Sequence, residues 1–106
     1  MACDFLLSKG KRVICRNYRC KYGEIDIIYQ DGEYIVFCEV KYRKDPKKGD
    51  PTEAVYFAKQ KKISSTAIFY LMSKKYKDDT PIRFDVISIL GSEVTLYKNA
   101  FEPVIY

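Results

Sequence analysis

The chain has 106 residues, of which 47% are hydrophobic and 31% are charged, and its formal net charge is +5. This length predicts one domain over residues 1–106, and the composition gives no sign of disorder. The chain has no histidine, which excludes Ser-His-Asp and Cys-His nucleophile systems and histidine-ligated zinc. Glycine-rich nucleotide-binding motifs are also absent from the sequence. Any chemistry must therefore use carboxylates, lysines, tyrosines or cysteines.

The apolar runs are only a few residues long, so no membrane-spanning helix is expected. The first ten residues hold too short an apolar segment for a signal peptide, which predicts a cytoplasmic protein. Thiols stay reduced in the cytoplasm, so the four cysteines are expected to be structural. Cys15 and Cys20 form a C-x4-C pair, which is wider than a zinc knuckle and has no second pair after it.

The positive charge is concentrated in two segments of the chain. Residues 9–22 hold six basic residues and no acid, and residues 41–48 hold five basic residues and one acid. Such blocks bind polyanions by releasing counterions, so nucleic acid is the leading partner class. A lysine-rich surface that only increases solubility is the alternative.

The hydrophobic pattern predicts seven elements. A short helix over residues 2–8 is expected to end at Gly10, and a long helix is expected from a capping segment at 50–53 to Lys75. Two central strands are expected to be joined by a turn at Asp31-Gly32. The predicted strands are 12–18, 24–29, 33–42, 82–90 and 94–98. The order α-β-β-β-α-β-β predicts an α/β fold with a single mixed sheet flanked by helices.

The predicted hairpin brings charged residues together. If Asp31-Gly32 is the turn, Asp26 lies opposite Phe37 and Glu24 lies opposite Glu39. Strict alternation then places four charged residues on one face and leaves the other face uncharged, with Ile25 and Ile27 among its members. The charged residues on the shared face are Glu24, Asp26, Glu39 and Lys41.

Several carboxylates beside apolar strands are costly unless something compensates them. A divalent cation is one compensation, because Mg²⁺ takes carboxylate, carbonyl and water oxygens. Asp26, Glu39 and the carbonyl of Val40 could supply three such ligands, and Lys41 could orient or deprotonate a water. The alternative is a cross-strand ion network at a solvated end of the sheet, without a metal.

Asp26 followed by a hairpin and then Glu39-Val40-Lys41 is similar to the PD-(D/E)XK motif of restriction-endonuclease-like folds, including archaeal-type Holliday junction resolvases. More closely, the chain resembles the YraN-like family assigned to that fold. The resemblance covers nearly the whole chain. Its most specific stretches are Gly23-Glu24-Ile25-Asp26 and Glu39-Val40-Lys41-Tyr42-Arg43.

The resemblance implies a metal-dependent nuclease fold with Asp26 and Glu39 as metal ligands, Lys41 as the catalytic lysine and Glu24 as an accessory acid. The cofactor would be Mg²⁺ or Mn²⁺, and the reaction would be endonucleolytic cleavage of DNA, with branched DNA as one candidate. Relatives usually begin with a G-x-x-G-E-x-x-A helix, and this chain starts near that alanine, at Ala2. The first helix is therefore expected to be truncated.

The short first helix keeps a second hypothesis open, a catalytically inactive nucleic-acid-binding module with a nuclease-like fold. By analogy with resolvase-like relatives, a homodimer is also expected. The residues expected to hold nucleic acid are Arg16, Asn17, Arg43, Lys44, Lys47 and Lys48.

Four further residues are left with two interpretations each. Tyr42 is either part of the core or an aromatic ring that stacks on a base. Lys59 on the long helix faces either the acids or solvent. Arg83 and Asp85 are expected to form an ion pair that anchors their strand, with contacts to phosphate and metal as the alternative.

Overall fold

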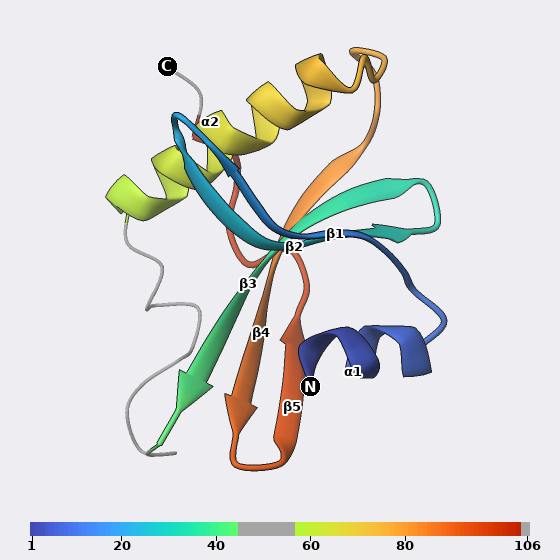
Figure 1. The fold of residues 1–106 in the computed structure, drawn as a ribbon, viewed down its shortest axis with the longest axis vertical. Helices are drawn as coiled ribbons and strands as arrows, with labels where there is room; N and C mark the ends of the chain where they lie inside the picture. Colours follow the sequence, from blue (N-terminus) through green and yellow to red (C-terminus); the bar gives the residue numbers. More distant parts are fainter. Residues whose placement is uncertain (45–56, 105–106) are drawn as a thin grey trace.

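A computed structural model describes residues 1–44 and 57–104 of the chain. One five-stranded sheet with the spatial order β1-β2-β3-β4-β5 carries a helix on each face (Figure 1). Neighbouring strands are antiparallel except β3 and β4, which are parallel, so the predicted mixed sheet and element order are confirmed. The elements are α1 (Ala2–Ser8), β1 (Arg12–Cys20), β2 (Gly23–Asp31), β3 (Tyr34–Arg43), α2 (Phe57–Ser73), β4 (Ile82–Leu90) and β5 (Glu93–Tyr97).

Most element boundaries agree with the sequence pattern. The helix α1 ends at Ser8, and Gly10 follows it with a φ of 77°, a left-handed conformation that suits glycine at a helix end. The predicted capping segment 50–53 of the long helix lies outside the described residues. All four cysteines are free thiols, and Cys38 is buried. No helix in the described part of the chain is long and apolar enough to span a bilayer.

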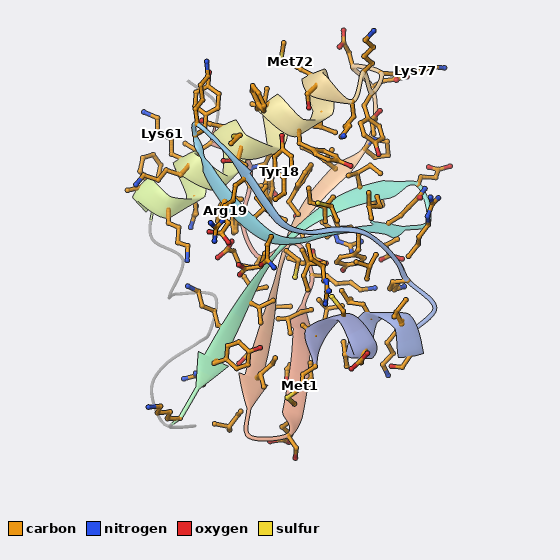
Figure 2. All side chains as sticks on the ribbon, viewed as in Figure 1. Met1, Tyr18, Arg19, Lys61, Met72 and Lys77 are labelled. Carbon is orange, nitrogen blue, oxygen red and sulfur yellow. The ribbon has the colours of Figure 1, made fainter. Side chains whose placement is uncertain are left out.

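The sheet has a hydrophobic core on each face, because β2, β3 and β4 are apolar in both directions. On the α2 side, Phe37 packs against Tyr70 and Phe84, and Figure 2 shows Tyr18 between β1 and this helix. The α1-side core is smaller. Its buried members are Ala2, Leu6, Ile27, Tyr29, Val36, Cys38, Ile87 and Ile89.

The β2–β3 turn differs from the prediction by one position. Asp31 pairs with Tyr34, so the turn is centred on Gly32 and Glu33, and the predicted turn at Asp31-Gly32 is wrong. Gly32 has a φ of 59° at the first central position, where a type II′ turn favours glycine. Asp31 is the last residue of β2, and its carboxylate accepts a hydrogen bond from the Lys11 ammonium at 2.8 Å.

The corrected turn moves the whole hairpin register by two residues. Ile28 now pairs with Phe37 and Ile27 with Cys38. Because side chains alternate with a period of two, an even shift keeps each residue on its face. The shift carries Asp26 from the predicted level of Phe37 towards Glu39, so the predicted pairs Asp26–Phe37 and Glu24–Glu39 are wrong.

The alternation of β2 is interrupted at Asp26. Ile27 and Tyr29 belong to the α1-side core, but Ile25 and Ile28 both belong to the α2-side core. The predicted place of Ile25 on the same face as Ile27 is therefore wrong. The neighbouring strand is also irregular at this level, because Asn17, which lies across from Asp26, has a left-handed φ of 53°.

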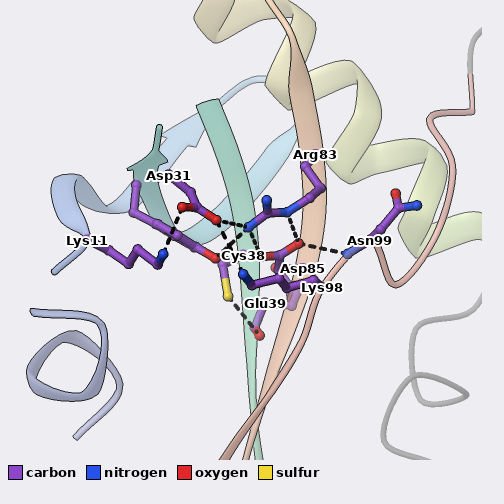
Figure 3. Close-up of polar contacts among 9 residues, drawn as sticks. Lys11, Asp31, Cys38, Glu39, Arg83, Asp85, Lys98 and Asn99 are labelled. Atoms are coloured by element: carbon purple, nitrogen blue, oxygen red, sulfur yellow. Dashed lines mark hydrogen bonds and ion pairs between the residues drawn. The ribbon is translucent and has the colours of Figure 1, made fainter. Parts of the chain in front are cut away.

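A buried ionic network joins β2 and β4 (Figure 3). The Arg83 guanidinium donates to both oxygens of Asp85 at 2.8 and 2.9 Å and to Asp31 at 2.9 Å. Asp85 is fully buried and also accepts from the Tyr29 hydroxyl and from the Asn99 backbone N–H. No buried side-chain nitrogen or oxygen among the described residues lacks a hydrogen-bond partner. The structure therefore gives Arg83 and Asp85 the anchoring role that the sequence favours.

Replacing Arg83 with Met should lower the free energy of unfolding by about 3 kcal/mol or more, because Asp85 would keep a buried charge without its cation. Urea denaturation at neutral pH measures the loss. The control is Lys98→Met, since this half-exposed side chain lies 3.6 Å from Asp31 and should contribute less than about 1 kcal/mol. Equal stabilities of the two variants would contradict the structural role of Arg83.

Asp31 should make the fold acid-labile. Hydrogen bonding to Lys11 and Arg83 lowers the pKa of Asp31 from 3.8 to about 2, against the opposing effect of burial. The unfolded chain therefore binds this proton more readily, so the stabilisation is present above pH 3.8 and is lost as the pH falls towards about 2. Asp31→Asn should cost about 2 kcal/mol at neutral pH and nothing below about pH 2. Urea unfolding curves of both proteins across this range test the convergence.

Candidate metal and catalytic site

The candidate site begins where the regular pairing of β2 and β3 stops. The backbone pairing of β2 and β3 ends at Ile27 and Cys38. Beyond that pair, the Val40 backbone N–H donates a hydrogen bond to Asp26 Oδ2 at 2.8 Å. A side-chain carboxylate thus takes the place of a main-chain acceptor at this point. The interrupted alternation of β2 at Asp26 turns its carboxylate towards β3.

The same contact fixes the direction of the Val40 carbonyl. In an antiparallel sheet, the N–H and C=O of a strand residue point to the same neighbouring strand. Because the Val40 N–H points to Asp26, its carbonyl oxygen lies on the same edge of β3. Val40 therefore offers an oxygen beside the Asp26 carboxylate.

Glu39 supplies a second carboxylate and is only 4% exposed. Its Oε2 atom lies 3.0 Å from the Lys59 ammonium, which reaches the strand from α2. Burial and the neighbouring Asp26 charge raise the pKa of Glu39 above its ordinary value, although Lys59 and Lys41 oppose this shift. The two carboxylates are therefore close enough to repel each other.

Lys41 completes the group from the same strand. Burial and the adjacent Lys59 ammonium lower the pKa of Lys41, against the attraction of Glu39 and Asp26. Burial would also lower the pKa of Lys59, but its contacts with Lys41 and Glu39 raise it. Asp26, Glu39, Lys41 and Lys59 together are called the acid–lysine cluster below. The predicted trio of Asp26, Glu39 and Lys41 does gather at one place.

The oxygens of the cluster match the ligands of one hard divalent ion. Mg²⁺ is commonly held by one or two carboxylates, with waters and substrate oxygens filling the other positions. The two carboxylates and the Val40 carbonyl suit that mode. Among residues 1–44 and 57–104, no group of three or more acidic or cysteine ligands forms a closed metal cage. The donor set therefore fits one Mg²⁺ or Mn²⁺ ion in an open coordination, with two carboxylates and one carbonyl from the protein.

Sequence comparison gives the family of this chain. Residues 1–89 match the model of the uncharacterised protein family UPF0102. A UPF0102 protein of Lachnoclostridium phytofermentans is 46% identical over 101 residues, which cover 95% of this chain and 86% of the relative. A relative from Clostridioides difficile is 46% identical over 103 residues, covering 95% and 90% of the two chains. A third, from Thermodesulfovibrio yellowstonii, is 42% identical over 101 residues, covering 95% and 88%.

The chain belongs to the UPF0102 family. This finding confirms the family resemblance. The family description states no activity, so the chemistry of this UPF0102 chain is argued from its own residues.

The other predicted site residues lie on β1, on β2 and at the end of β3. The carboxylate of Glu24 pairs with Arg19 on β1 at 3.3 Å, and both side chains are largely exposed. Arg16 and Asn17 are exposed on β1 across from β2, at the level of Ile27 and Asp26. Arg43 ends β3, and the exposed Lys44 follows it. The predicted contacts of Lys47 and Lys48 lie outside the described residues.

The sequence left Lys59 open between the acids and solvent, and the structure places it on the acids. The spacing of residues in the long helix already favoured the side of α2 that faces the sheet for Lys59. Lys59 precedes the buried residues Ile63 and Ala67 by four and eight positions, which places it on the same face of α2. This spacing places Lys59 where its side chain can reach the sheet, although it does not name Glu39 as the partner.

Saturating Mn²⁺ should raise the melting temperature of the protein, because an ion held by Asp26 and Glu39 binds only the folded state. At about 100 times the dissociation constant the stabilisation is about 2.7 kcal/mol, which is roughly 10 °C for a domain of this size. Asp26→Asn should abolish the shift in a thermal unfolding experiment. Glu93→Gln, which changes an exposed acid of β5, is the control and should keep it. An equal shift in Asp26→Asn would contradict the assigned ligands.

Proposed function

We propose that this chain is a Mg²⁺- or Mn²⁺-dependent endonuclease of the PD-(D/E)XK type that cleaves phosphodiester bonds in DNA, including branched DNA. The observation that carries the proposal is the gathering of Asp26, Glu39 and Lys41 where β2 and β3 stop pairing. The Val40 N–H contact at 2.8 Å ties the two strands together at that level. Two carboxylates can hold a divalent ion, and a nearby amine can orient or deprotonate the water that attacks the phosphate.

The carboxylates and the Val40 carbonyl would hold the ion. When bound, it would supply an activated water and charge stabilisation on the phosphate. Glu39 is kept in place by the 3.0 Å ion pair with Lys59, so this ligand is oriented before the ion binds. A preformed ligand set lowers the reorganisation needed during the reaction.

Lys41 would act directly on the reacting atoms. Its amine lies on the same strand as Glu39, two residues further on, and interacts electrostatically with Glu39 and Asp26. From there it would orient the attacking water, take its proton, or stabilise the negative charge that develops on the phosphate oxygens. Lys59 touches Glu39 rather than the reacting atoms and is a positioning residue.

The charge distribution supports a polyanionic substrate. The chain carries a net charge of +5 with its basic residues concentrated at 9–22 and 41–48. The second of these segments begins at the catalytic lysine, so the backbone of a bound strand would meet the basic residues next to the cluster. The homodimer and the cytoplasmic location belong to the same proposal. Neither is required for the chemistry, because one chain supplies the whole cluster.

The direct test is cleavage of duplex, single-stranded and four-way-junction DNA in the presence of Mn²⁺. Lys41→Ala should reduce the cleavage rate by about 100-fold or more, the usual contribution of a positioned acid or base. Asp26→Asn should reduce it at least as much. Lys74→Ala, which removes an exposed lysine just beyond α2, is the control and should cleave at the wild-type rate. The proposal fails if the wild type cleaves none of these substrates or if Lys41→Ala cleaves normally.

A second candidate function is binding of nucleic acid without cleavage. It is favoured by the ion pair that already compensates Glu39 and by the absence of a third acid in the described part of the cluster. This function predicts salt-dependent DNA binding that Mg²⁺ does not change. Binding curves with and without Mg²⁺, measured beside the cleavage assay, separate the two functions.

A further inference from the structure

A cavity of about 260 Å³ opens on the α1 side of the sheet, next to Asp26 of the acid–lysine cluster. It lies between the first turn of α1 and strands β1, β2 and β3, and it shares Asp26 and Val40 with the candidate metal site. The lining residues that matter for its chemistry are Arg16, Asn17, Asp26, Ile27, Val40 and Tyr42.

The cavity combines an aromatic ring, a cation and an amide. Tyr42 is 74% exposed although it is a large hydrophobic side chain at the end of a central strand. Arg16 has no carboxylate partner within residues 1–44 and 57–104. Asn17 carries both donors and an acceptor and is held in a left-handed conformation with φ 53°. Ile27 and Val40 add apolar surface between these polar groups.

This combination suits one nucleotide better than a simple anion. An exposed tyrosine ring offers a stacking surface for a base, a guanidinium binds a phosphate, and an amide can bond a base edge. A small anion would use only Arg16 and would meet the Asp26 carboxylate in the same cavity. The Tyr42 ring, the Asn17 amide and the apolar lining would then contact no part of the ligand.

We propose that this cavity takes one unpaired nucleotide of a DNA strand, with its base on Tyr42 and its phosphate on Arg16. The inference rests on the proposed function, because Asp26 and Val40 place the neighbouring phosphate at the metal site. A base inside a duplex is stacked on both faces and cannot present one of them to Tyr42. The substrate class is therefore DNA with an unpaired nucleotide next to the cleaved bond, as in single strands, flaps and imperfectly paired branch points.

The binding test uses metal-free protein at one salt concentration, with single-stranded and fully paired oligonucleotides that carry 2-aminopurine. Tyr42→Ala should weaken single-strand binding by about 5- to 100-fold, the range given by the loss of one base–aromatic stack. It should leave duplex binding within about twofold of the wild type, and Tyr42→Phe should restore single-strand binding. Arg16→Ala should also weaken single-strand binding, and the change in 2-aminopurine fluorescence should be lost with Tyr42→Ala.

The controls are a basic residue and an aromatic residue that do not line the cavity. Lys74→Ala removes an exposed lysine just beyond α2, and Tyr22→Ala removes a half-exposed tyrosine next to α2. Both should bind single-stranded DNA like the wild type, within about twofold. Unchanged binding by Tyr42→Ala, or an equal loss for duplex and single strand, would overturn the inference.

The same variants separate this inference from the proposed function. Cleavage that depends on Lys41 but not on Tyr42 would support the proposed nuclease function and contradict the nucleotide pocket. Single-strand binding that depends on Tyr42, without cleavage of any substrate, would support the nucleotide pocket and contradict the proposed nuclease function.

Discussion

The contact between the Val40 N–H and the Asp26 carboxylate is the constraint on which the candidate site depends. An antiparallel pair normally continues by main-chain hydrogen bonds, and here a side chain replaces one of them. The replacement interrupts the alternation of β2 and brings a charge from its edge to the backbone of β3. It also directs the Val40 carbonyl to the same place, so one hydrogen bond arranges two of the three oxygens that could bind a metal.

The two buried groups of charges, around Asp85 and around Glu39, differ in how fully hydrogen bonds and ion pairs compensate the carboxylate. Around Asp85, two oxygens accept from Arg83, Tyr29 and the Asn99 N–H, so the carboxylate is fully compensated within the fold. Around Glu39, burial and the nearby Asp26 carboxylate raise its pKa, and Lys59 offsets only part of this effect. Complete compensation stabilises a fold, whereas carboxylates that remain close and mutually repelling are suited to bind a cation.

The two helices contribute to different parts of the site, because each of them covers one face of the sheet. From α2, Lys59 reaches Glu39 and holds it for the metal site. From the other face, the first turn of α1 closes the cavity that also holds Arg16 and Tyr42. The acid–lysine cluster and the proposed nucleotide pocket therefore meet at Asp26 and Val40. A substrate phosphate at the cluster would have its neighbouring nucleotide within reach of the pocket.

The sequence by itself determined the element order, the mixed sheet and the grouping of Asp26, Glu39 and Lys41, because apolar periodicity and strand alternation act over a few neighbouring residues. An error of two residues in the hairpin register did not change the face of Glu39 or Lys41, since the shift was even. Asp26 joins them through the break in the alternation of β2 and its contact with the Val40 N–H. Only the tertiary structure decided that Ile25 packs with Ile28, that Glu24 pairs with Arg19 and that Lys59 meets Glu39. The place of Ile25 accompanies the break in the alternation of β2, and the place of Lys59 depends on α2 packing on the sheet. Helix periodicity places Lys59 on the sheet-facing side of α2, but only the packing of α2 on the sheet selects Glu39 as its partner.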